Sequence, residues 1–312
     1  MQETHRDADR AAVKETNRWR RMGIGDWIER RASLVFIAPA VFAVLLLIGY
    51  PLVWNLYMSL QKWELGRQPP EFIGLTNYIN ALSAPRFHQG VFKTLYYSVL
   101  ATLIPTTLGL GAALAFNERF FARGLLRSVF ALPMMATPVA VALIWQLMYH
   151  PALGVFNYLL SLVNLPPSLW VASSQTVIPS VALVESFQAT PFAALVILGG
   201  LAALPAGLYE ASKIDGASAI QRFRYLTLPL VWPYIVVVLL IRSVDALKAF
   251  DSIFVLTQGG PGRASETINI LLFLQAFNFY HVGYSASMVV MLFILVVGAA
   301  LVLTRLRRDP SW

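Results

Sequence analysis

Six long apolar runs dominate the chain, and they restrict its fold more than any other feature does. A helix of about 20 mainly apolar residues crosses the hydrocarbon of a bilayer. A soluble globule of 312 residues that is 57% hydrophobic and 13% charged would lack the polar surface to cover itself. We therefore expect an all-α polytopic membrane protein with six transmembrane helices. The predicted spans are 34–60, 91–116, 128–149, 177–201, 232–256 and 284–303.

The distribution of positive charge predicts how these spans are oriented. If the chain crosses the membrane six times, seventeen Lys and Arg residues lie on the side of the two ends and five on the other side. Cytoplasmic loops carry an excess of Lys and Arg, so we expect the tails 1–33 and 305–312 in the cytoplasm. The tail 1–33 is too long and too acidic for a targeting signal, and span 34–60 is expected to be retained. The net charge of +8 then reflects the orientation of the chain in the membrane. Membrane lipid is an expected partner and nucleic acid is not.

Metal and enzyme chemistry find little support in the sequence. The chain has no cysteine, so it has no disulfide, no thiolate metal site and no cysteine nucleophile. Its four histidines lie outside the predicted spans without metal-like spacing. No Ser-Lys or paired-Asp set suggests catalysis. We expect no catalytic and no metal-binding residue.

Between the fourth and fifth predicted spans lies a segment, 203–231, that is too polar for lipid. Proline favours a helix start and glycine the position just beyond a helix end, so a first helix is expected from Pro205 to Gly216. A second short helix over 218–226 follows the turn, and Leu228-Pro229 is expected to stop it before the fifth span. Two short helices at an angle would form a compact cytoplasmic protrusion.

This segment resembles the EAA loop of ABC importer permeases, whose pattern is Glu-Ala-Ala, three residues, Gly, nine residues, Ile or Leu, one residue, and Leu-Pro. Glu210, Ala211 and Gly216 match that pattern, Ser212 replaces the second Ala, and Leu228-Pro229 closes it. Together with six spans and the position between the fourth and fifth, the resemblance covers roughly 92–304. It implies the fold of a type I ABC importer permease with cytoplasmic coupling helices.

A second stretch of sequence narrows the group of permeases that the chain resembles. Residues 250–262 end in Leu-Thr-Gln-Gly-Gly-Pro-Gly, and carbohydrate permeases of the maltose and glycerol-3-phosphate type usually carry Leu-Thr-x-Gly-Gly-Pro at the end of the fifth span. A Gly-Gly-Pro-Gly run cannot continue a helix, so we expect it to end that span and turn the chain at the outer face. The resemblance implies a carbohydrate importer.

The resemblance also implies an assembly in a bacterial inner membrane. This chain would pair with a second homologous permease subunit, an ATPase subunit dimer and an extracytoplasmic solute-binding protein, and the complex would carry a carbohydrate. The chain lacks a Gly-x-x-x-x-Gly-Lys-Ser phosphate-binding loop. ATP and Mg are therefore expected on the partner ATPase subunits, and no cofactor on this chain.

In such an assembly the EAA loop would seat in a cleft of one ATPase. Glu210 would meet an arginine or a backbone donor, Ile220 and Phe223 would supply apolar contact, and Gly216 would permit a tight angle that a side chain would obstruct. The candidate ATPase-coupling residues are Glu210, Ala211, Ser212, Asp215, Gly216, Ile220, Phe223, Leu228 and Pro229.

Charged residues recur every three positions in the fifth predicted span, namely Arg242, Asp245, Lys248 and Asp251. Successive members would be neighbours on one helix. An ionised side chain near the bilayer centre costs roughly 2.5 to 3.5 kcal/mol on insertion scales, so each should face a partner or water. Either the row is a structural ladder that holds two permease subunits together, or Asp245 and Lys248 face the central cavity and bind sugar hydroxyls.

The fourth predicted span also carries polar side chains at membrane depth. Glu185 and Gln188 lie on one helical face before Pro191, and Glu185 is expected to pair with Arg242 or Lys248. In the third predicted span, Trp145 could stack on a sugar ring or belong to an interfacial aromatic belt. The candidate substrate-pathway residues are Asp245, Lys248, Asp251, Glu185, Gln188 and Trp145.

A secondary transporter driven by an ion gradient is the alternative. It would also need six or more spans and intramembrane carboxylates. It would leave the EAA-like loop unexplained.

Overall fold

The computed structural model describes residues 36–67, 69–118 and 120–305, and it divides the chain into two units that meet after Tyr57. The predicted tail 1–33 and almost all of the tail 305–312 lie outside the described residues. The described residues of the first unit belong to one apolar helix, Phe36–Ser59, in which a π-helical turn η1 (Leu45–Gly49) precedes α3 (Tyr50–Ser59). No part of its most apolar stretch is buried by protein. A helix of 24 residues that is apolar all round is typical of a membrane span.

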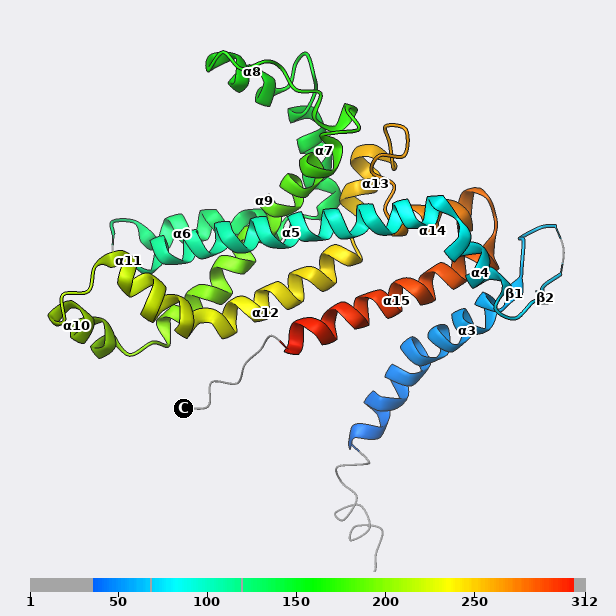
Figure 1. Ribbon diagram of the computed structural model, residues 1–312, viewed down its shortest axis with the longest axis horizontal. Helices are drawn as coiled ribbons and strands as arrows, with labels where there is room; N and C mark the ends of the chain where they lie inside the picture. The colour runs from blue at the N-terminus through cyan, green and yellow to red at the C-terminus, as the bar shows by residue number, and fades with distance from the viewer. Residues whose placement is uncertain (1–35, 68, 119, 306–312) are drawn as a thin grey trace, which may run out of the picture. The chain divides into compact units, whose positions relative to one another are not determined.

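Four long helices organise the second unit, namely α5 (Pro85–Asn117), α9 (Val177–Ala202), α12 (Leu228–Leu247) and α15 (Val282–Arg305). Helix α9 is the central one, since 56% of its most apolar stretch is buried compared with 22% for α15. It lies along α5 so closely that a Cβ on Gly109 would come within 2.6 Å of the Ala193 Cβ (Figure 1). Small residues permit such close packing of transmembrane helices.

The third predicted span is not one straight helix. Helix α6 (Arg123–Ala131) continues through the 3-10 turn η2 (Leu132–Met135), and α7 (Pro138–Met148) then leaves at an angle of 98°. The apolar run 128–149 predicts one straight helix, but its two prolines, Pro133 and Pro138, lie within the first two residues of η2 and of α7. The described residues contain five helices that could span a membrane, or six if this bent pair is one span.

The fifth predicted span is wrong at both ends. Its helix does not begin at residue 232, because α11 (Ala219–Arg222), the π-helical turn η4 (Phe223–Thr227) and α12 form one helix, Ala219–Leu247. Leu228-Pro229 does not stop this helix. In the π-helical turn the Leu228 amide bonds to the Phe223 carbonyl, and the proline follows within the first turn of α12. At the other end α12 stops at Leu247, and α13 (Asp251–Thr257) is a separate helix.

Short elements join the long helices at the end of the unit where α5 begins. They are the antiparallel strands β1 (Gln61–Lys62) and β2 (Glu71–Phe72), α4 (Thr76–Ser83), α14 (Ile268–Phe273) and the π-helical turn η5 (Leu274–Asn278). Beyond the bend lie α8 (Val155–Leu162) and the 3-10 turn η3 (Trp170–Ala172). Gln258 caps α13 at a φ of +49°, and the Gly-Gly-Pro-Gly run follows it with positive φ at Gly259 and Gly262, so the run lies just beyond a helix end as expected.

Candidate functional site

The polar segment after α9 folds into one of the two predicted short helices, and the predicted second one, 218–226, forms the first part of the long helix Ala219–Leu247. Helix α10 (Ala206–Ile214) has Pro205 at its N-cap, and the chain then turns through Gly216 at a φ of +75°. Helix α11 starts with a capping box, in which the Ser218 amide donates to Gln221 Oε1 at 2.7 Å and the Gln221 amide donates to Ser218 Oγ at 3.3 Å. The turn is therefore fixed by glycine on one side and by the capping box on the other.

Large apolar side chains project from this protrusion. Ile214 is 86% exposed, Ile220 is 78% exposed and Tyr225 is 74% exposed. Glu210, Ala211, Asp215 and Gly216 are exposed as well, and no ion pair reaches Glu210 from the described residues. Exposed apolar residues on a polar protrusion favour a protein partner.

Other predicted coupling residues point inward. Ser212 is half-buried and its hydroxyl donates to the Tyr209 carbonyl at 2.8 Å. Phe223 is half-buried and lines a pocket beneath the protrusion. Leu228 packs against the core between α9 and α12, and Pro229 is exposed. Among the predicted apolar contacts, Ile220 is the more accessible and Phe223 supports the loop from within.

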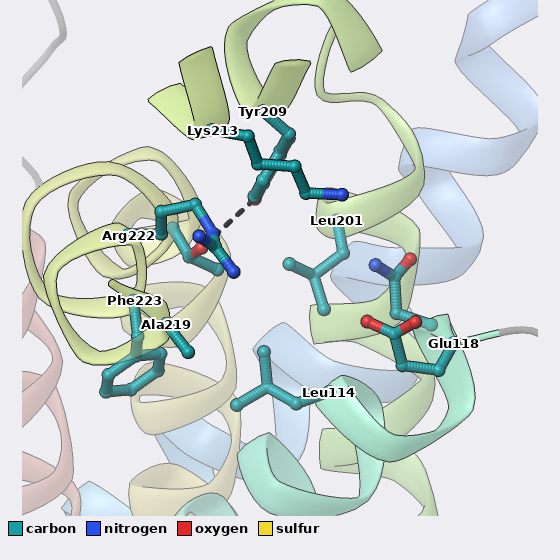
Figure 2. Close-up of a pocket in the computed structure, with 10 residues that line it drawn as sticks. Leu114, Glu118, Leu201, Tyr209, Lys213, Ala219, Arg222 and Phe223 are labelled. Carbon is teal, nitrogen blue, oxygen red and sulfur yellow. Dashed lines mark hydrogen bonds between the residues drawn. The ribbon is translucent and has the colours of Figure 1, made fainter. Parts of the chain in front are cut away.

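That pocket was missed by sequence reasoning. It has a volume of about 470 Å³ and lies between the short helices and the ends of α5 and α9. Figure 2 shows Lys213 and Arg222 extending from the short helices, with Glu118 on the opposite side. A hydrogen bond of 3.1 Å between the hydroxyls of Tyr209 and Thr227 ties α10 to η4. The residues that line this pocket come from three distant segments of the chain, so no local sequence pattern could have revealed the pocket.

A network of ion pairs lies at the other end of α12. Arg242 donates through Nη2 to Glu185 Oε1 of α9, which confirms the predicted pairing of Glu185. Its Nη1 lies 3.6 Å from Asp245 Oδ2, and Lys248 Nζ lies 3.8 Å from Asp245 Oδ1. The prediction that Asp251 continues this row on the same helix is wrong, because α12 ends before it and Asp251 begins α13.

Gln188 and Trp145 have local partners. Gln188 donates through Nε2 to the Ala136 carbonyl at 2.5 Å, and so holds the bend between η2 and α7. The Trp145 ring lies 5.4 Å from Tyr149, 5.1 Å from Phe156 and 5.5 Å from Phe187, centroid to centroid. Both side chains stabilise the bent third span.

Comparison with known proteins decides the family. The family described as "Binding-protein-dependent transport system inner membrane component" matches residues 105–309. The chain belongs to this family. It is therefore a membrane permease subunit of an ABC importer and not an enzyme, and ATP hydrolysis resides in a separate subunit. A secondary transporter is not favoured.

The sequences of relatives align with this permease along most of its length. The trehalose/maltose transport system permease protein MalF of Thermococcus litoralis is 36% identical over 90% of this chain and 96% of its own length. The sulfoquinovosyl glycerol transport system permease protein SmoG of Agrobacterium fabrum is 32% identical over 97% of this chain and 98% of its own length.

The fold of the permease is also that of a solved structure. A chain from a bacterial alginate ABC transporter, crystallised in complex with an alginate pentasaccharide-bound periplasmic protein, superposes with a TM-score of 0.79. The match covers 91% of this chain and 97% of that one at 20% identity, so it establishes the fold alone.

Proposed function

We propose that this permease subunit forms half of a carbohydrate pathway and receives motion from the ATPase through the loop 203–231. The observation that carries the proposal is the unbroken helix Ala219–Leu247. Its 29 residues span about 43 Å at 1.5 Å per residue. One end belongs to the exposed protrusion and the other carries the ion-pair network. A displacement of the protrusion would therefore reach Asp245 without crossing a joint.

The protrusion is the proposed contact with an ATPase subunit. Ile214, Ile220 and Tyr225 would enter an apolar cleft, and Glu210, which has no ion-pair partner among the described residues, would meet a cation or a backbone donor. ATP and Mg would bind to the ATPase dimer and not to this chain.

The cargo and the remaining partners follow from the relatives. The name of one of them gives trehalose and maltose, which are uncharged sugars with many hydroxyl groups. Asp245 and Lys248 offer the acceptor and donor that hydroxyls require. We further propose a second homologous permease, an extracytoplasmic solute-binding protein, and a bacterial inner membrane with both termini of this chain in the cytoplasm.

Proteoliposomes that contain the complete complex test the coupling. Ile220→Glu should lower both sugar uptake and substrate-stimulated ATP hydrolysis at least fivefold, because a carboxylate would enter an apolar contact. Phe121→Glu is the control, since Phe121 is 98% exposed in the loop after α5, on the same predicted side. Undiminished uptake and hydrolysis in the Ile220 variant would contradict the proposed contact.

A further inference from the structure

The ion-pair network contains a buried half and an open half. The side chains of Arg242 and Glu185 are 10% and 17% exposed, whereas those of Asp245 and Lys248 are 47% and 57% exposed. Ionised groups within a span do not face hydrocarbon without a large cost. The open pair therefore borders either water or a neighbouring protein surface.

The backbone beside the open pair favours water. Helix α12 ends at Leu247, the chain is non-helical at Ala249 and Phe250, and α13 starts at Asp251. Within a membrane, non-helical backbone occurs only where protein buries it or where it lines a water-filled cavity. Protein covers one side of this break, since Asn269 Nδ2 donates to the Leu247 carbonyl at 2.9 Å. On the other side Lys248 is exposed and charged, which suits water better than an apolar surface.

Charges within this network are balanced. Arg242 and Lys248 each have a carboxylate within 4 Å, that of Glu185 and that of Asp245 respectively. No cation of the network is left to neutralise a phosphate, sulfonate or uronate. An anion brought beside it would find each cation already paired with a carboxylate, and would lose hydration without gaining a counter-charge.

We propose that Arg242 is a positioning residue that holds Asp245 beside Lys248, and that the balanced pair makes this subunit selective for uncharged polyhydroxylated solutes over anionic ones. The inference rests on the carbohydrate pathway proposed above. The two Nη groups of Arg242 reach two carboxylates on different helices, which a planar guanidinium can do and a lysine ammonium cannot reproduce. Glu185 of α9 thereby fixes the guanidinium, and the guanidinium restrains Asp245.

Selectivity is tested by binding to the permease and ATPase assembly in nanodiscs without solute-binding protein. Saturation-transfer NMR titrations with trehalose and trehalose 6-phosphate should show at least tenfold weaker binding of the phosphate. Asp245→Asn should reduce the ratio of the two dissociation constants at least fivefold, because Lys248 then lacks its counter-charge. Equal affinity for both probes, absence of trehalose binding, or an unchanged ratio in the variant would each overturn the selectivity.

Positioning is tested by uptake kinetics of the complete complex. Arg242→Lys should raise the KM for trehalose about tenfold and leave kcat within twofold. Since breaking the buried pair could disturb folding, the double variant Glu185→Leu with Arg242→Met removes both charges together. It should assemble normally and show the same rise in KM. An unchanged KM in the assembled double variant would overturn the positioning role.

These outcomes separate the inference from the function on which it rests. If the wild-type complex takes up no neutral sugar, the carbohydrate pathway itself fails. If it takes up trehalose and the nanodisc titrations show no preference against the phosphate, the pathway stands and the selectivity fails.

Discussion

At the scale of single residues, Gly216 offers a sharp test because it has a matched neighbour. A Cβ at Gly216 or at Gly207 would meet nothing within 4 Å, but only Gly216 has a positive φ, of +75°. Alanine in that conformation costs about 1 kcal/mol, which corresponds to about a fivefold loss of the docked loop. We expect Gly216→Ala to lower uptake about fivefold and Gly207→Ala to leave it unchanged. Equal uptake in both variants would show that the turn is not required.

Two ion pairs of different burial allow a second comparison at this scale. Arg86 donates to both oxygens of Glu266 at 2.8 and 2.7 Å, and the Glu266 side chain is 4% exposed. Arg86→Met would leave a buried carboxylate unpaired, and should destabilise the protein by about 3 kcal/mol. Arg67 of the exposed pair with Glu64 is the control, and Arg67→Met should cost less than about 1 kcal/mol. Thermal unfolding of the detergent-solubilised complex measures both. Similar losses of stability in the two variants would contradict the expectation that the buried ion pair contributes more than the exposed one.

At the scale of elements, the unbroken helix Ala219–Leu247 makes its own prediction. Replacing Leu240-Ile241 by Gly-Gly would soften the helix between the protrusion and Asp245, since each glycine costs about 1 kcal/mol in a helix. Uptake should fall at least fivefold while ATP hydrolysis continues. Gly-Gly at Leu301-Val302, exposed near the end of α15, is the control. Uptake that stays in proportion to hydrolysis would show that stiffness is not required.

Sequence patterns located the apolar elements better than their ends. Apolar length identified the helices α5, α9 and α15 because lipid imposes that length. It could not reveal the 98° bend at the third span or the break after Leu247, because prolines are tolerated within transmembrane helices and no glycine or proline marks the break. Pro229 was misinterpreted as a stop because a preceding π-helical turn is not visible in a sequence pattern.

At the scale of the whole molecule, part of the candidate site could be predicted and part could not. The short helices around Gly216 follow from local signals, and the pairing of Glu185 with Arg242 follows from the cost of buried charge. The pocket beneath the protrusion depends on the meeting of α5, α9 and α10, which no local pattern encodes. Non-local packing accounts for most of what the sequence left open.

The orientation of the whole molecule can be tested because the chain has no cysteine, so any introduced thiol is unique. Phe121 and Leu153 are 98% and 88% exposed in loops on opposite predicted sides. In spheroplasts a membrane-impermeant maleimide should label Leu153→Cys and not Phe121→Cys, and inside-out vesicles should reverse the pattern. The positive-inside rule gives this result from seventeen basic residues against five. Labelling of Phe121→Cys in spheroplasts would place its loop outside the cell. The protrusion 203–231 would then lie outside too, where it could not meet a cytoplasmic ATPase.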